Sequence, residues 1–144
     1  MALHGTYDPD NIFAKMLRGD IPAVTVLDDP VALAFMDIFP QSRGHTLVIP
    51  KDIAARNFLD LPADRLGAYM TRVQSVARAV EQALSPDGIV VTQFNGAPAG
   101  QTVFHLHFHI IPRYEGTALK GHGAGQQADM DVLQATAEKI RAAL

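Results

Sequence analysis

Three histidines alternate with apolar residues where the chain reads His-Leu-His-Phe-His-Ile-Ile, from residue 105 to residue 111. Successive side chains of a β-strand point to opposite faces of the sheet. A strand over residues 102–112 would therefore place His105, His107 and His109 on one face. The apolar residues between and beside them would lie on the other face: Phe104, Leu106, Phe108 and Ile110. We expect that apolar face to enter a core and the three imidazoles to line a shared surface.

Aligned imidazoles are suited to covalent catalysis at phosphorus. An imidazole is largely unprotonated near neutral pH, and in that form it is a good nucleophile. The phosphoramidate that it forms is reactive enough for water to resolve it. Neighbouring imidazoles can donate protons and stabilise charge on the phosphoryl oxygens. Because adjacent cationic rings repel each other, at least one of the three should stay neutral.

Two other interpretations of the histidines remain open. Neighbours on one face of a strand lie about 7 Å apart and a zinc–nitrogen bond is about 2 Å long, so two rings could share an ion but three would strain a regular strand. Because the chain has no cysteine, further ligands would have to come from residues such as Asp37, His45 or His122. Alternatively, the three histidines are solvated residues on a polar strand face.

The loop before the histidines favours a phosphate ligand. Glycines such as Gly96 and Gly100 let backbone N–H groups approach an anion closely. Asn95 and Gln101 offer amide donors, and Thr102 offers a hydroxyl. An Asn-Gly pair is equally typical of a plain turn, so the loop supports a phosphate site only because it lies beside the histidines.

Composition limits the class of protein. A chain of 144 residues that is 48% hydrophobic is most simply one domain, residues 1–144. Its formal net charge of −3 argues against a nucleic-acid partner, because such proteins usually carry a basic excess. No stretch approaches the roughly 20 apolar residues of a membrane span. The absence of cysteine suits a reducing compartment. We therefore expect a soluble cytoplasmic protein.

The hydrophobic pattern predicts an α+β domain. Helices are expected over residues 11–18, 63–84 and 129–144, and strands over residues 23–27, 31–36, 46–50, 89–94 and 102–112. Short turns join most of the strands, which favours a mainly antiparallel sheet of about five strands. The long helix should pack on one face of that sheet and leave the other exposed. A Gly-rich segment over residues 114–127 precedes the last helix.

Taken together, these motifs resemble the histidine triad (HIT) family. The stretch 105–111 matches the family's His-φ-His-φ-His-φ-φ signature, where φ is apolar. The resemblance extends over residues 8–115, and it includes Ile12-Phe13, the segment 34–51 with Asp37 and His45, and the loop from Asn95 to Val103. It implies an α+β HIT-like fold and a homodimer. It also implies hydrolysis of nucleoside phosphoramidates or dinucleoside polyphosphates at the α-phosphate, without a cofactor.

The resemblance also assigns roles to individual residues. His107 would be the nucleophile that carries the nucleotidyl group, and the His105 carbonyl would orient it. His109 would contact phosphate oxygens and assist proton transfer, with support from His45. For the purine nucleotide, the ribose would bind Asp37, the base would lie against Phe13, Phe35 and Ile38, and the phosphate would be held by Asn95, Gln101, Thr102 and Val103. Phe35 and Ile38 are as well suited to a core as to a pocket.

Departures from the family pattern sharpen this interpretation. Some relatives carry a Cys-φ-φ-Cys motif that can hold zinc, but here Asn11-Ile12-Phe13-Ala14 stands in its place, so we expect no metal. The transferase branch has Gln as the third triad member, so His109 favours hydrolysis. Residues 116–144 contain no recognisable motif. Two alternatives remain: a non-catalytic purine-nucleotide-binding module, and a zinc-binding protein.

Overall fold

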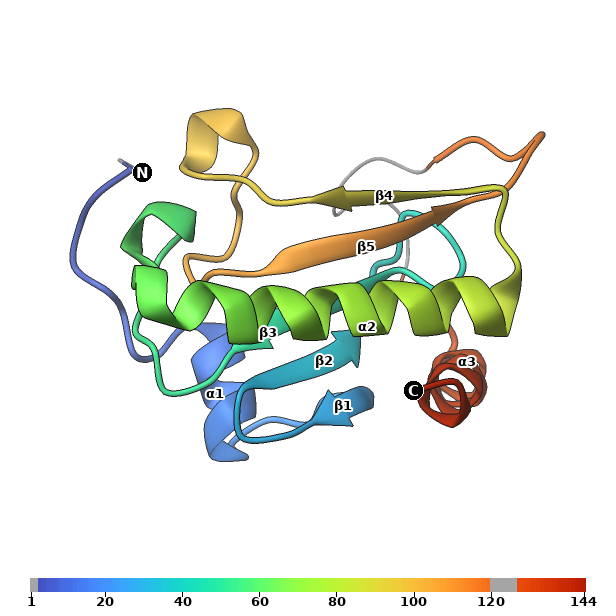
Figure 1. The fold of residues 1–144 in the computed structure, drawn as a ribbon, viewed down its shortest axis with the longest axis horizontal. Helices are drawn as coiled ribbons and strands as arrows, with labels where there is room; N and C mark the ends of the chain where they lie inside the picture. Colours follow the sequence, from blue (N-terminus) through green and yellow to red (C-terminus); the bar gives the residue numbers. More distant parts are fainter. Residues whose placement is uncertain (1–2, 120–126) are drawn as a thin grey trace.

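Five strands form a single antiparallel sheet in the order β1-β2-β3-β5-β4 (Figure 1). The computed structural model describes residues 3–119 and 127–144. The strands are β1 (Thr25–Asp28), β2 (Ala32–Met36), β3 (Thr46–Pro50), β4 (Gly88–Thr92) and β5 (Phe108–Arg113). Because every pairing is antiparallel and helices flank the sheet, the predicted α+β class is confirmed.

Three α-helices surround the sheet: α1 (Ile12–Arg18), α2 (Leu66–Leu84) and α3 (Met130–Ala142). The long helix α2 lies across one face, and α3 packs near its C-terminal end and beside β1 (Figure 1). Short 3₁₀ turns cover Phe58–Asp60, Ala63–Arg65 and Ala97–Ala99. Among the described residues, no helix combines the length and apolarity needed to cross a bilayer.

The centre of the sheet is buried on both faces, which differs from the prediction of one exposed face. All residues of β2 and β3 are buried. One face contributes Ala34, Val48 and Ile110 to a core shared with α2 and α3. On the other face, Phe13 of α1 packs over Phe35. The short helix α1 therefore covers the surface that we expected to be open, and it creates a walled site there.

Capping hydrogen bonds hold α1 in this position. The side-chain oxygen of Asn11 accepts hydrogen bonds from the backbone N–H groups of Phe13 and Ala14, which lack partners within the helix. Gly19, with a φ of 81°, ends the helix in the left-handed conformation that glycine adopts most readily. Both ends of the predicted helix over residues 11–18 are therefore explained by local chemistry.

Gly44 allows the chain to enter β3 just before His45. Its φ is 94°, and an added Cβ would lie 2.3 Å from Cδ1 of Leu84 in α2. The backbone here must be both left-handed and close to the helix, which only glycine permits without strain. The placement of His45 thus depends on its small neighbour.

We expect Gly44→Ala to lower the free energy of unfolding by about 1–3 kcal/mol, because the strained φ and the contact with Leu84 both oppose a side chain. Gly67→Ala is the matched control, since Gly67 is an exposed helical residue with open space around its Cα. It should stabilise the protein by about 0.5 kcal/mol. Urea denaturation of both variants measures the difference, and equal stabilities would contradict the role given to Gly44.

Candidate active site

Strand β5 begins at Phe108, so only one of the three histidines lies in regular β-structure. The expectation of a strand over residues 102–112 is wrong for its first half. The β3–β5 ladder runs from Thr46 opposite Ile110 to Val48 opposite Phe108. Every second residue of β3 directs its backbone N–H toward β5. After Thr46 and Val48 the next such residue is Pro50, which has no backbone N–H with which to extend the ladder. The N–H of Leu106 instead donates to the carbonyl of Ala55, at 2.9 Å.

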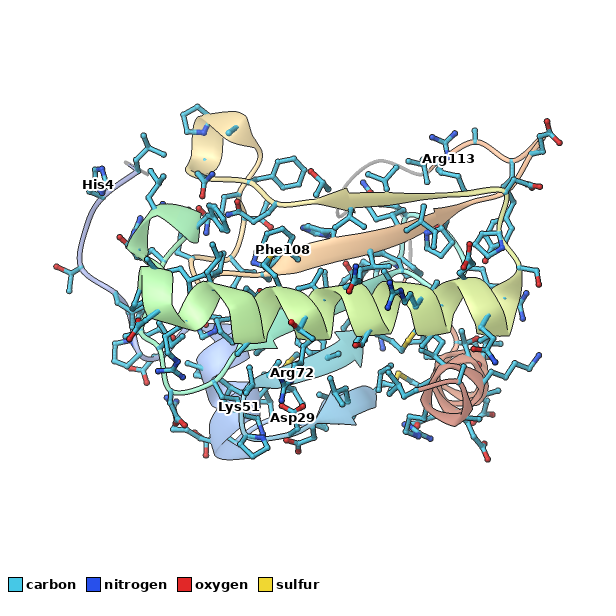
Figure 2. The ribbon with its side chains drawn as sticks, in the orientation of Figure 1. His4, Asp29, Lys51, Arg72, Phe108 and Arg113 are labelled. Carbon is cyan, nitrogen blue, oxygen red and sulfur yellow. The ribbon has the colours of Figure 1, made fainter. Side chains whose placement is uncertain are left out.

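Phe108 fixes which way the neighbouring histidines point. Its ring, labelled in Figure 2, packs edge to face with Tyr69 of α2; the ring centroids are 5.8 Å apart. Because side chains alternate across the sheet, His107 and His109 project to the opposite face, toward α1. Their ring centroids lie 5.0 Å apart. Phe104 departs from the predicted apolar face, since its ring lies 4.9 Å from the guanidinium carbon of Arg56.

A hydrogen bond to the backbone sets the tautomer of His107. Its Nδ1 lies 2.7 Å from the carbonyl oxygen of His105. A carbonyl only accepts hydrogen bonds, so Nδ1 must carry the proton. In the neutral ring Nε2 then keeps its lone pair, which is the form that attacks an electrophile. The edge of the ring also packs on Phe13, at 5.0 Å between centroids, so its plane is held as well.

A second chain of hydrogen bonds sets the proton on His109. The backbone N–H of Gln41 donates to Nδ1 of His45, at 3.0 Å, so neutral His45 carries its proton on Nε2. That Nε2 lies 3.0 Å from Nδ1 of His109 and donates to it. Neutral His109 must therefore carry its own proton on Nε2. His107 and His109 thus have complementary roles, because one offers a lone pair and the other a proton.

His105 does not share the cavity surface that we predicted for all three rings. Its Nδ1 lies 2.6 Å from the hydroxyl oxygen of Tyr7, and its ring faces the edge of Phe13. The pKa of His105 is lowered to about 4, chiefly by burial; the hydrogen bond with the Pro50 backbone raises it, and the electrostatic effect of His107 lowers it. The ring is therefore neutral near pH 7, and it is the backbone carbonyl of His105 that contacts His107.

A cavity between α1 and the end of β2 opens beside His107 and His109. Its lining is mostly apolar and includes Asp37 and the two imidazoles: Ile12, Phe13, Met16, Phe35, Met36, Asp37, Ile38, Phe39, Leu47, Thr102, Val103, His107 and His109. Oδ1 of Asp37 accepts the N–H of Phe39, at 2.8 Å, which fixes the carboxylate. The structure therefore brings together the predicted Phe13, Phe35, Asp37, Ile38, Thr102 and Val103.

Asn95 and Gln101 lie outside this lining, unlike the other predicted nucleotide-binding residues. The side-chain oxygen of Asn95 accepts hydrogen bonds from the N–H of Phe58 and the amide of Gln93. The amide of Gln101 is buried, where it donates to the carbonyls of Arg56 and Val103 and accepts from the N–H of Gly96. Both amides therefore shape the loop, and Thr102 and Val103 are its residues at the cavity.

Asp37, His45 and His109 are the described residues that come nearest to forming a metal site. One ligand atom from each lies within 4.8 Å of the others. However, the hydrogen bond from Gln41 requires Nε2 of neutral His45 to carry a proton, and a protonated nitrogen cannot bind a metal. The cluster fits zinc only if that bond is broken. His122, the other ligand that we considered, lies outside the described residues.

Several residues at the site were not predicted as site residues from the sequence. Ile12, Met16, Phe39 and Leu47 complete the apolar wall, although their types and spacing are equally typical of a core. Gln41 acts through its backbone N–H, which every residue except proline possesses. Tyr7 reaches His105 across 98 positions of the chain, and a single tyrosine near the N-terminus does not reveal such a contact.

Comparison with known proteins identifies relatives of this chain. The model of the HIT domain matches residues 18–116. A solved HIT-like protein from Bartonella henselae is 50% identical, with a TM-score of 0.90 over 97% of this chain and 100% of the other. Adenosine 5'-monophosphoramidase hnt1 of Schizosaccharomyces pombe is 42% identical over 71% of this chain and 73% of its own length.

A plant relative is more distant. Adenylylsulfatase HINT3 of Arabidopsis thaliana is 35% identical over 79% of this chain and 57% of its own length. The sheet order and helices described above are those of the α+β HIT fold, as the similarity to the Bartonella structure shows. Together with the family model, which matches more than half of the sequence, these likenesses show that the chain belongs to the HIT domain family.

Proposed function

We propose that this chain is a nucleotidyl hydrolase that cleaves nucleoside phosphoramidates or dinucleoside polyphosphates at the α-phosphate through a covalent intermediate on His107. One observation carries the proposal: the hydrogen bond from Nδ1 of His107 to the His105 carbonyl, which leaves Nε2 as the nucleophile. Two relatives add support, because they are named as an adenosine 5'-monophosphoramidase and an adenylylsulfatase.

In the first step Nε2 of His107 attacks the α-phosphorus. A nitrogen–phosphorus bond forms while the bond from phosphorus to the leaving group breaks, and the leaving group departs with the electron pair of that bond. Nε2–H of His109 supplies the proton that the leaving group takes up. The hydrogen bond from Nε2 of His45 to Nδ1 of His109 stabilises the deprotonated ring until water returns a proton in the second step. The buried rings and apolar wall restrict water around the phosphoryl oxygens, which strengthens electrostatic stabilisation there.

In the second step water attacks the same phosphorus. The water passes a proton to His109, the nitrogen–phosphorus bond breaks, and a nucleoside monophosphate leaves. The proton of His107 stays on Nδ1, hydrogen-bonded to the His105 carbonyl, through both steps, so the ring that leaves phosphorus is again a neutral nucleophile. Asp37 is positioned to accept hydrogen bonds from the ribose hydroxyls, and the base would lie between α1 and β2.

We also infer a cytoplasmic homodimer. β4 is the edge strand of the sheet on the side nearest the triad strand, and Val91 in it is 49% exposed. An exposed strand edge is commonly covered by a second subunit. Sedimentation velocity should give a single species of twice the chain mass at micromolar concentration, whereas a stable monomer would refute the dimer.

His107→Ala should abolish hydrolysis, with a loss of at least about 1000-fold in kcat, because the variant lacks the nitrogen that forms the covalent intermediate. His4→Ala is the matched control, since His4 is an exposed histidine away from the cavity and its loss should leave kcat unchanged. Rapid acid quenching of wild-type protein with excess substrate should trap about one nucleotidyl group per chain, and peptide mass spectrometry should place it on His107.

Turnover by His107→Ala near the wild-type rate would refute the mechanism. Wild-type protein that binds AMP but neither hydrolyses these substrates nor forms the adduct would favour the alternative of a non-catalytic binding module. Enzyme whose activity disappears with a chelator and returns with zinc would favour the zinc alternative.

Asp37→Asn should raise KM about tenfold with a smaller change in kcat, because a charged acceptor of the ribose hydroxyls becomes a neutral one. The sharper measurement compares ribonucleotide substrates with their 2',3'-dideoxy analogues. Wild-type enzyme should prefer the ribonucleotide, and Asp37→Asn should lose most of this preference. If the preference stays unchanged in the variant, Asp37 does not bind the ribose.

A further inference from the structure

We propose that Tyr7 is a positioning residue for the reaction: its hydroxyl holds the His105 ring, and thereby the backbone carbonyl that orients His107. The inference rests on the proposed role of His107 as the nucleophile. It concerns a residue outside the triad, at the opposite end of the sequence, which does not line the cavity.

The contact between Tyr7 and His105 is close and enclosed. The hydroxyl oxygen lies 2.6 Å from Nδ1 of His105, and the two rings meet edge to face at 5.7 Å between centroids. The His105 side of this contact is buried, with only 1% of the residue exposed. We assign Nδ1 of the neutral ring as the acceptor of the phenolic O–H, which places the ring proton on Nε2.

His105 needs such a support because it lies ahead of β5. No ladder of strand hydrogen bonds fixes its backbone. The peptide that joins His105 to Leu106 is held at its two ends, by Leu106 N–H donating to Ala55 and by the His105 carbonyl accepting from His107. A His105 ring that is free to rotate would let this peptide tilt, and the hydrogen bond to His107 would then change in length and direction.

The segment that carries Tyr7 is itself fastened to the domain. Nδ2 of Asn57 donates to the Leu3 carbonyl at 2.8 Å, and the Arg56 guanidinium donates to the Thr6 carbonyl at 3.1 Å. Arg56 in turn lies over the ring of Phe104. The backbone of residues 3–7 therefore forms a strap, which we call the N-terminal strap, that is anchored by Asn57 and Arg56 and delivers the Tyr7 hydroxyl to the His105 ring.

The test is Tyr7→Phe, with Tyr114→Phe as the matched control. The Tyr114 hydroxyl also bonds across the fold, to the Arg43 carbonyl at 2.8 Å, but it lies away from the triad cavity. We expect Tyr7→Phe to lower kcat and the rate of adduct formation about tenfold, because small displacements of a reacting group are costly. KM should stay unchanged, and Tm should move no more than in the control.

Nuclear magnetic resonance of ¹⁵N-histidine-labelled protein gives a readout that is independent of turnover. In Tyr7→Phe, the ¹⁵N shift of His105 Nδ1 should move away from that of a hydrogen-bonded acceptor, and the Nδ1 proton of His107 should shift upfield and exchange faster with water. Tyr114→Phe should show neither change. Such a pattern separates positioning from a general loss of stability.

The inference is overturned if Tyr7→Phe matches Tyr114→Phe in kcat and in the His107 Nδ1 proton resonance. It is also overturned if kcat falls only in proportion to the folded fraction. If the proposed function itself is wrong, the result is different, because the wild-type protein would then form no covalent nucleotidyl adduct. The histidine resonances would still decide in that case whether Tyr7 orients His105 and His107.

Discussion

The hydrogen bond from Nδ1 of His107 to the His105 carbonyl is the interaction on which the active site depends. It decides which nitrogen of the central ring has a lone pair, and it fixes the direction of that lone pair. The hydrogen bonds from Gln41 to His45 and from His45 to His109 have the opposite effect on His109, because they place the proton of its neutral ring on Nε2. Two adjacent imidazoles of the same chemical type thus present a lone pair and a proton, the two groups that the proposed reaction needs, because their hydrogen-bond partners differ.

The fold supplies these partners by ending a strand at a particular residue. Pro50 gives no N–H to the β3–β5 ladder, so the chain before Phe108 leaves the sheet and its carbonyl at His105 turns toward a side chain. Phe108 anchors the same point from the other face by packing on Tyr69. The helix α1 then closes the histidine face with Phe13, and converts a sheet surface into a cavity.

Much of this arrangement could be predicted from the sequence. Periodicity located α2 and all five strands to within a few residues, except the start of β5, and alternation correctly separated His107 and His109 from Phe108. The missing parts are hydrogen bonds whose partners the sequence does not reveal. Gln41 contributes a backbone group, Tyr7 acts across 98 residues, and the amides of Asn95 and Gln101 bond to the backbone of Phe58 and Arg56. Residue type alone does not show which partner a polar group selects in the folded chain.

The tautomers of the histidines test this account most directly. Long-range ¹H–¹⁵N correlation spectra of the wild-type protein near pH 7 distinguish protonated from unprotonated ring nitrogens without any substrate. The account predicts a proton on Nδ1 of His107 and on Nε2 of both His45 and His109. A proton on Nε2 of His107, or a fully protonated His107 ring, would contradict it, because the proposed nucleophile would then have no lone pair to offer.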